Sequence, residues 1–143
     1  MKFGSLSSSV DEPFRVVLID PKTDEPLVDI NGDEAYIDVL SSQSDAGRKF
    51  DRDRQKVITR RAMRNRSQDI VDDDQFEVNI LKLARLTKSW HLVDPVSKEP
   101  IDAEFSQEAA VEFYKLPLAF PFYMQAWLAA NEPANFMKGS SKS

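Results

Sequence analysis

The stretch from Phe105 to Phe136 concentrates the large apolar side chains of this chain and constrains its fold more than any other feature. It holds eight of the fourteen aromatic residues in the sequence. Small and aromatic residues recur there at the spacing of one helical face: Ala109, Ala110, Phe113 and Tyr114. Because Ser106 is a good N-cap and Pro117 cannot continue a helix, the pattern predicts a helix between them.

A second helix is predicted after Pro121, where the helical spacing resumes in Phe122, Ala126, Trp127 and Ala130. Asn131-Glu132-Pro133 ends it. Two interpretations of the region stay open. The aromatics can form the core of a small domain, as large aromatics commonly do, or part of their surface can bind a partner. In the second interpretation the hypothetical partner-binding residues are Trp90, Phe105, Phe113, Tyr114, Phe122, Tyr123, Trp127 and Phe136.

Length and composition predict one soluble domain. The chain has 143 residues, of which 41% are hydrophobic, and this is enough for a core that needs no disulfide or metal to stabilise it. We expect a flexible Ser-rich arm over 1–12, a single domain over 13–136 and a flexible polar tail over 137–143. The absence of cysteine excludes disulfides and thiolate metal sites. We recognise no secretory signal and no run of roughly 20 apolar residues that would suit a membrane span.

The N-terminal part predicts a small antiparallel sheet. The β-branched residues of 14–19 indicate a strand, and the turn formers of 20–26 indicate a loop after it. A short strand over 27–30 and a partner strand over 35–40 are predicted to flank a type I′ turn at Asn31-Gly32.

The next segment predicts a strongly cationic helix. Ser41 to Ser44 offer several N-caps, and good helix formers run from Asp45 to about Arg66 with one interruption at Gly47. Its predicted buried face consists of Phe50, Val57, Ile58 and Ala62. The segment from Arg48 to Arg66 contains nine Lys or Arg and two Asp, so its net charge is +7. Since the whole chain has a net charge of −5, the remainder carries −12. The charges expected to act in interactions are Arg52, Arg60, Arg61 and Arg64.

A further amphipathic helix is predicted from a capping box at Asp74 and Glu77, with an apolar stripe that steps towards Trp90. Residues 91–103 carry two Asp-Pro or Glu-Pro breaks and indicate a loop or short hairpin. The fold class is therefore α+β, with a small N-terminal antiparallel sheet packed on about four helices.

Catalytic and cofactor chemistry lack a pattern in this sequence. His91 is the only histidine and has no neighbouring motif, so a packing or capping role is favoured over general base chemistry. Asp29 to Asp33 begins like a calcium loop, but Glu34 stands where glycine is required and Leu40 where glutamate is required. With four glycines, the chain has no phosphate loop or dinucleotide fingerprint. We expect a protein that is not an enzyme, with no metal and no cofactor.

Nucleic-acid binding by the basic helix 48–66 is an alternative that the sequence leaves open. Nine cations could neutralise several phosphates. A net charge of −5, and the distance in sequence between that helix and the stacking aromatics, argue against it.

The order of elements resembles the tail assembly chaperones of long-tailed, siphovirus-type bacteriophages. The pieces that carry the likeness are Asp20–Leu27, Ser41–Arg66, Trp90, Phe105–Pro117 and Ala134-Asn135-Phe136. It covers most of residues 14–136 and includes no catalytic signature.

The resemblance implies a non-catalytic protein of the host cytoplasm that is absent from the mature virion. Its partners would be the tape measure protein, which it keeps soluble, and the tail tube protein, whose polymerisation it assists. The alternative from the same assembly is a structural tail component, such as a connector or completion protein. Self-association is a further expectation, with the cationic helix facing an acidic patch that includes Asp69, Asp72, Asp73 and Asp74.

Overall fold

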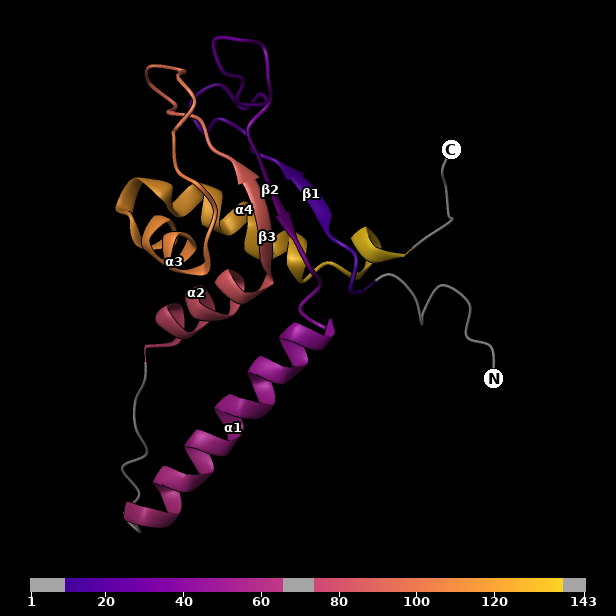
Figure 1. Cartoon of the computed structure of the whole chain (residues 1–143), viewed down its shortest axis with the longest axis vertical. Coiled ribbons are helices and arrows are strands. Elements are labelled where there is room, and N and C mark those ends of the chain that lie inside the picture. Colours follow the sequence, from indigo (N-terminus) through magenta and orange to yellow (C-terminus); the bar gives the residue numbers. More distant parts are fainter. Residues whose placement is uncertain (1–9, 66–73, 138–143) are drawn as a thin grey trace.

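The computed structural model describes residues 10–65 and 74–137 of the chain. It has the α+β fold that the sequence predicts, a three-stranded antiparallel sheet packed on helices (Figure 1). In chain order the elements are β1 (Phe14–Val17), β2 (Tyr36–Val39), α1 (Asp45–Asn65), α2 (Gln75–Leu86), β3 (Thr87–His91), α3 (Gln107–Lys115), η2 (Pro117–Ala119), α4 (Phe120–Ala130) and η3 (Pro133–Phe136).

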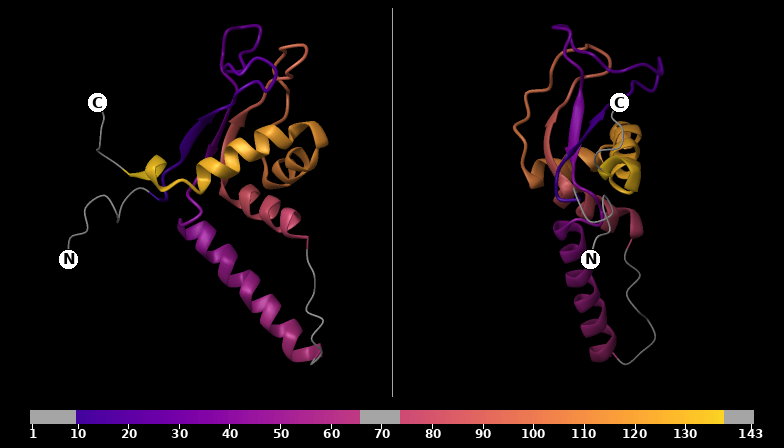
Figure 2. Two further views of the ribbon diagram at one scale, coloured as in Figure 1. Left: turned by 180° about the vertical axis from the view of Figure 1, so that it is seen from behind. Right: turned by 90° about the vertical axis from the view of Figure 1, so that its right-hand side faces the viewer.

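The two faces of the sheet differ because residues alternate across it. Val16 and Ile37 are paired in register on the inner face and buried, and α4 packs across β1 and β2 there (Figure 2). On the outer face, Arg15, Asp38 and Ser89 come from the three strands in turn.

Asp38 links all three strands through its carboxylate. Arg15 donates from Nε to Oδ1 at 2.9 Å and from Nη2 to Oδ2 at 3.0 Å, and Ser89 Oγ donates to Oδ2 at 2.7 Å. Burial raises the pKa of Asp38, but the hydrogen bonds from Arg15 and Ser89 outweigh burial and hold the pKa below its ordinary value.

The third strand corrects the sequence prediction that α2 continues towards Trp90. The helix ends at Leu86, and both the backbone N–H and the hydroxyl of Thr87 bind the Leu83 carbonyl oxygen, the hydroxyl at 2.8 Å. The chain therefore passes from helix into strand without a loop, and the sheet takes a strand from the middle of the chain. Of the two structures predicted for residues 91–103, a loop or a short hairpin, the hairpin is formed, with a bridge between Val93 and Pro100.

Two loops share one turn structure, which we call the twin turns: 20–26 (DPKTDEP) and 94–100 (DPVSKEP). In each turn the N–H of the first Asp binds the carbonyl of the Glu, at 2.8 Å from Asp20 to Glu25 and 2.9 Å from Asp94 to Glu99. The residue before each Glu has positive φ, 65° and 64°. The repeat is visible in the sequence once the two turns are superposed.

The twin turns lie against each other. Ile30 N–H binds the Lys98 carbonyl at 2.9 Å, and Lys98 Nζ binds Asp20 Oδ2 at 3.0 Å. A hydrogen bond from the Lys22 N–H, followed by the one from Lys98, holds the pKa of Asp20 below its ordinary value.

The predicted type I′ turn at Asn31-Gly32 is wrong. Gly32 has φ 90°, but Asn31 is not among the residues with positive φ, which that turn requires at both positions. The loop is organised instead by the Asp29 carboxylate, which accepts from the N–H groups of Asn31 and Asp33 at 2.8 and 3.0 Å. β2 pairs with β1 on one side and with β3 on the other, and the predicted hairpin is reduced to one bridge between Val28 and Glu34.

α1 begins as predicted and projects from the body (Figure 1). Ser44 is its cap, since its hydroxyl accepts from the Gly47 N–H at 3.2 Å. Asp11, which lies within the arm expected over 1–12, contacts the start of α1, because its Oδ1 accepts from the Asp45 N–H at 2.8 Å. Residues 1–9 of that arm, and residues 138–143 of the predicted tail, lie outside the described residues.

The boundaries predicted for α3 and the end predicted for α4 are confirmed, whereas α4 begins at Phe120 and includes Pro121 in its first turn. The Ser106 hydroxyl accepts from the Ala109 N–H at 3.0 Å, and Pro117 separates α3 from α4 through the short helix η2. Together with the inner face of the sheet and with α2, they enclose one core, in which Leu83, Tyr114 and Ala126 are buried. That core positions the surfaces described next.

Candidate functional site

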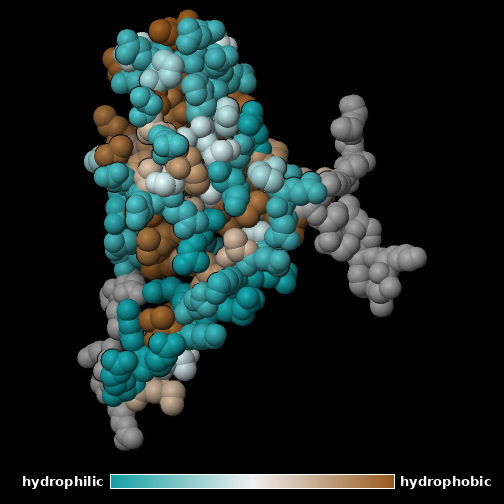
Figure 3. Space-filling view, viewed as in Figure 1, coloured by the Kyte–Doolittle hydropathy of each residue, from teal (hydrophilic) through white to brown (hydrophobic). Residues whose placement is uncertain are grey.

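An apolar groove lies between the second twin turn and the α3–η2–α4 corner. Its volume is about 350 Å³. The lining consists of Leu18, Leu27, Leu92, Val93, Asp94, Pro95, Val96, Ile101, Phe113, Leu116, Leu118, Ala119 and Phe122. The floor is buried core, whereas the rim is exposed, and apolar side chains gather on the side of the body at the level of α3 and α4 (Figure 3).

The rim residues on the helix side are exposed because of the proline between the two helices. Leu116 is extended, with φ −68° and ψ 134°, as a residue before proline prefers. The tight turn that follows leaves Leu118 89% exposed and Leu116 54% exposed. Across the groove, Val96 at the tip of the second twin turn is 85% exposed. Contiguous exposed apolar residues are a common feature of interaction surfaces, which makes the groove a candidate.

The eight aromatics that the sequence offered as partner-binding residues divide into two groups. Tyr114, Phe122, Tyr123 and Phe136 are buried, so in this conformation they form core. Trp90, Phe105, Phe113 and Trp127 are half-buried. Of all eight, Phe113 and Phe122 line the groove. Half of these candidate residues therefore lie in the core, and two of the eight line the groove.

Trp90, Phe105 and Phe113 form a packing cluster on the edge of the sheet. The Trp90 ring meets Phe105 and Phe113 edge to face, with centroids 5.2 and 5.6 Å apart. Its indole N–H binds the Ala103 carbonyl at 2.9 Å, which holds the segment that leads to α3. Trp127 stacks on Tyr123 at 6.1 Å and faces the cleft between α1 and α2.

Sequence reasoning missed the aliphatic rim of the groove. Leu116 and Leu118 flank Pro117, and Val96 and Ile101 belong to a segment interpreted only as loop. The usable signal was the Leu-Pro-Leu triplet, because leucines on both sides of a helix break cannot both follow the helical stripe.

The cationic helix α1 is the second surface. Arg52, Arg60 and Arg64 are exposed and Arg61 is half-buried. The predicted buried face is not formed: Phe50, Val57 and Ile58 are only half-buried and Ala62 is exposed. The reason is the direction of α1, which meets α2 near its start and then diverges from the body (Figure 1).

Two side-chain contacts of described residues join the first part of α1 to α2. Lys82 Nζ binds Asp51 at 3.1 Å, and the Arg85 guanidinium lies 5.6 Å from the centre of the Phe50 ring. A shallow groove along the outer face of α1 is lined by Arg52, Gln55, Lys56, Thr59, Arg60 and Met63. Of the acidic patch proposed to face this helix, residues 69, 72 and 73 lie outside the described residues, and Asp74 caps α2 by accepting from the Phe76 N–H at 3.0 Å.

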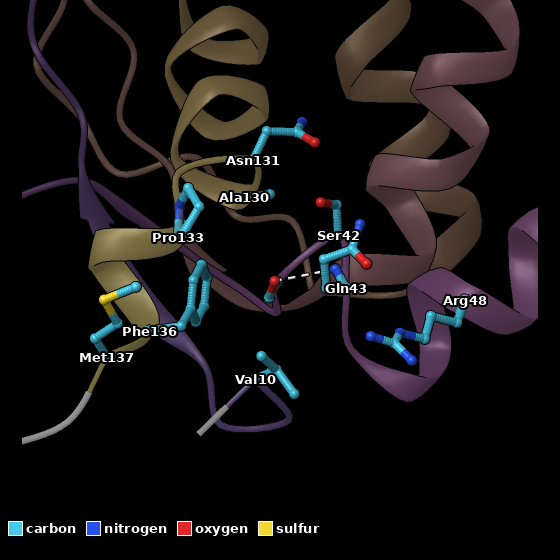
Figure 4. A pocket seen from close by; sticks show the side chains of 10 residues that line it. Val10, Ser42, Gln43, Arg48, Ala130, Asn131, Pro133, Phe136 and Met137 are labelled. Carbon is cyan, nitrogen blue, oxygen red and sulfur yellow. Dashed lines mark hydrogen bonds between the residues drawn. The ribbon is translucent and has the colours of Figure 1, made fainter. Parts of the chain in front are cut away.

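A cavity of about 240 Å³ lies where the start of α1 meets the end of α4 and η3 (Figure 4). Ser41 Oγ accepts there from the Gln43 N–H at 3.0 Å. Val10 and Met137, the first and last described residues, both line it. Arg48 is the one charged residue among the described residues that line it.

His91 has a structural partner. Its Nε2 lies 2.9 Å from Asp29 Oδ2, and Asp29 is buried. Hydrogen bonds from the Asp33 N–H and then from His91 lower the pKa of Asp29. The pair ties β3 to the loop before β2. Within residues 10–65 and 74–137, no group of three or more metal-ligating side chains occurs, and no helix is long and apolar enough to cross a membrane.

Comparisons of the chain with family models, with curated proteins and with solved structures found no match.

Proposed function

We propose that this protein is a tail assembly chaperone of a long-tailed bacteriophage. It binds the tape measure protein in the host cytoplasm, keeps it soluble, assists polymerisation of the tail tube and stays out of the mature virion. It acts by binding alone and catalyses no reaction. The proposal combines the resemblance of its sequence elements with one structural observation, the apolar groove beside α3 and α4.

The groove supports this function because its chemistry suits an amphipathic helix. Val96 on one wall and Leu116 and Leu118 on the other are exposed aliphatic residues above a buried apolar floor. A helix that inserts side chains at i, i+3 and i+4 would bury both surfaces. A tape measure protein is a long helical chain with apolar stripes, so a groove of this kind would shield one segment of it.

The test is co-expression of the chain with the tape measure protein encoded beside it. We expect the two proteins to co-purify and the tape measure protein to gain solubility. The variant Leu116→Asn with Leu118→Asn should lose both effects, since it makes the rim polar without touching the buried floor. Leu128→Asn is the matched control, because Leu128 is 60% exposed on α4 and lies outside the groove lining.

Two results would overturn parts of the proposal. If the wild-type chain neither co-purifies with the tape measure protein nor raises its solubility, the chaperone function is wrong. If the rim variant binds as well as wild type, the groove is not the binding site. Mass spectrometry of purified virions separates the chaperone from a structural tail component, because only the latter would remain in the particle.

A further inference from the structure

The outer face of α1 carries a row of cations. Lys49, Arg52, Lys56 and Arg60 are spaced three and four residues apart and therefore lie along one side of the helix. This side points away from Asp51, which contacts α2. Arg52, Lys56 and Arg60 are exposed and form no ion pair with any residue of the described ranges.

The other end of the molecule is acidic. The twin turns and the loop beside them expose five carboxylates: Asp24, Glu25, Asp33, Glu34 and Glu99. Within the part of the chain that the structure describes, none of the five forms an ion pair. Of the two lysines in the turns, Lys98 is already bound to Asp20, and Lys22 remains exposed. This surface, which we call the loop end, is therefore net negative.

The two charged regions cannot neutralise each other within one molecule. The loop end and α1 lie at opposite ends of the longest axis of the chain (Figure 1), and the views from behind and from the side show the same separation (Figure 2). Symmetrical pairing of two copies through α1 would oppose like charges, and so would pairing through the loop end. A contact between unlike ends avoids both costs.

We propose that copies of this chain associate head to tail, with the outer face of α1 in one copy docked on the loop end of the next. Such a contact joins two different surfaces, so it can repeat and produce an open row of molecules. α1 is about 30 Å long, which lets its cations reach carboxylates from both twin turns. The contact does not require the tape measure protein, although a row of copies could bind along a protein that is extended.

Charge balance favours a second copy over nucleic acid as the occupant of α1. The net charge of the whole chain is −5, so a polyanion that approached α1 would be repelled by the rest of the molecule. The loop end offers carboxylates on a surface that each copy already carries. Binding to nucleic acid is therefore an outcome of the test.

The experiment measures the mass of the full-length chain by light scattering and sedimentation velocity at neutral pH. We expect assemblies that grow with protein concentration at about 0.01 M salt and dissociate at about 1 M, because the Debye length falls from about 30 Å to about 3 Å. Lys56→Glu with Arg60→Glu should weaken association by about tenfold or more. Glu25→Lys with Glu99→Lys should weaken it similarly.

Restoration by complementary charges tests the geometry. A mixture of the two double variants should form complexes again, because the unaltered α1 of the loop-end variant can dock on the unaltered loop end of the α1 variant. The variant that carries all four changes should associate with itself, because its new carboxylates on α1 meet new ammonium groups on the loop end. Lys88→Glu with Lys115→Glu is the matched control: it changes the net charge as much as the α1 variant does, but on β3 and α3, and it should associate like wild type. Circular dichroism verifies that each variant folds.

Three results would overturn the proposal: a wild-type chain that stays monomeric at low salt, association that neither reversal weakens, or a mixture that fails to recover. Fluorescence anisotropy with a short DNA duplex tests the alternative that α1 binds nucleic acid. If the monomer binds the duplex and the α1 variant does not, α1 is a nucleic-acid site. None of these readouts involves the tape measure protein, so failure here is distinct from failure of the proposed chaperone function.

Discussion

The buried hydrogen bond between Thr87 and Tyr114 allows a test of whether Tyr114 stabilises the core or binds a partner. Tyr114 OH lies 2.8 Å from Thr87 Oγ1, and Thr87 Oγ1 donates to the Leu83 carbonyl at 2.8 Å. Because the threonine proton is used there, Tyr114 is the donor between the two hydroxyls. Both side chains are buried, and burial raises the pKa of Tyr114 far above its ordinary value.

The two ways of breaking this bond should differ in cost. Tyr114→Phe removes the donor but leaves Thr87 bound to Leu83, so we expect a loss of about 1 kcal/mol in the free energy of unfolding. Thr87→Val leaves the tyrosine hydroxyl buried without a partner and should cost more, about 2–3 kcal/mol. Adding Tyr114→Phe to Thr87→Val removes that orphaned hydroxyl. The double variant should therefore be at least about 1 kcal/mol more stable than the sum of the single effects implies.

Urea unfolding followed by circular dichroism measures all four proteins, and co-purification with the tape measure protein is measured alongside. We expect the Tyr114→Phe variant to bind the tape measure protein as wild type does, since this hydroxyl faces the core. Additive losses in the double variant would refute the hydrogen-bond argument. A binding defect in a stably folded Tyr114→Phe protein would instead indicate that Tyr114 contacts the partner.

Three further predictions concern the sheet and the start of α1. Asp38→Asn should lower the free energy of unfolding by about 2 kcal/mol in urea titrations, because it removes a charged acceptor shared by three strands. The lowered pKa values of Asp20, Asp29 and Asp38 stabilise the fold above the ordinary pKa of 3.8, so stability should fall as the pH drops below that value; thermal unfolding between pH 2 and about 5 checks this, with a shallower fall in Asp38→Asn. Gly47→Ala would normally stabilise a helix by about 1 kcal/mol, but here a Cβ would lie 2.8 Å from the Ser42 carbonyl carbon and closer still to its oxygen, so a lower melting temperature is expected.

Helix positions were predictable because their signals are local. Ser44, Asp74 and Ser106 each accept a hydrogen bond from a backbone N–H in the first turn of the helix that follows, and Pro117 separates two helices. Each of these signals acts over a few residues, so the sequence displays it directly. The strands 14–17 and 36–39 were predictable for a similar reason, since their β-branched and apolar residues have few other structures open to them.

β3 was not predictable because its evidence is not local. The sequence Thr-Lys-Ser-Trp-His has no apolar alternation, and it becomes a strand by pairing with Tyr36 to Val39, far away in the chain. Asp38 illustrates the difficulty, since its charge argues against a buried strand until Arg15 and Ser89 are placed beside it. Pairing partners decide such segments, and no window of sequence contains them.

The groove was missed for a related reason. Its floor joins Leu18, Leu92 and Phe122, which come from three separate parts of the chain. Sequence reasoning gave most weight to aromatics, because these dominate both cores and interfaces. In this fold many of the large aromatic rings fill the core. The exposed apolar surface beside them is aliphatic, as at Leu116 and Leu118.

α1 is where the sequence pattern and the structure differ most. The charge of this helix was predicted, but its predicted apolar face is at most half-buried, and among its described residues only Gly47, which has no side chain, is buried. A helix that buries so little depends on its caps, at Ser44 and Asp11, and on helix propensity, and such helices are marginal in water. Docking on the loop end of a neighbouring copy would cover the outer face of α1, and the half-buried Phe50 and Ile58 would remain in the cleft towards α2. Hydrogen exchange should therefore slow along α1 under the low-salt conditions in which the chains associate, while exchange in α4, whose inner side is already in the core, stays constant.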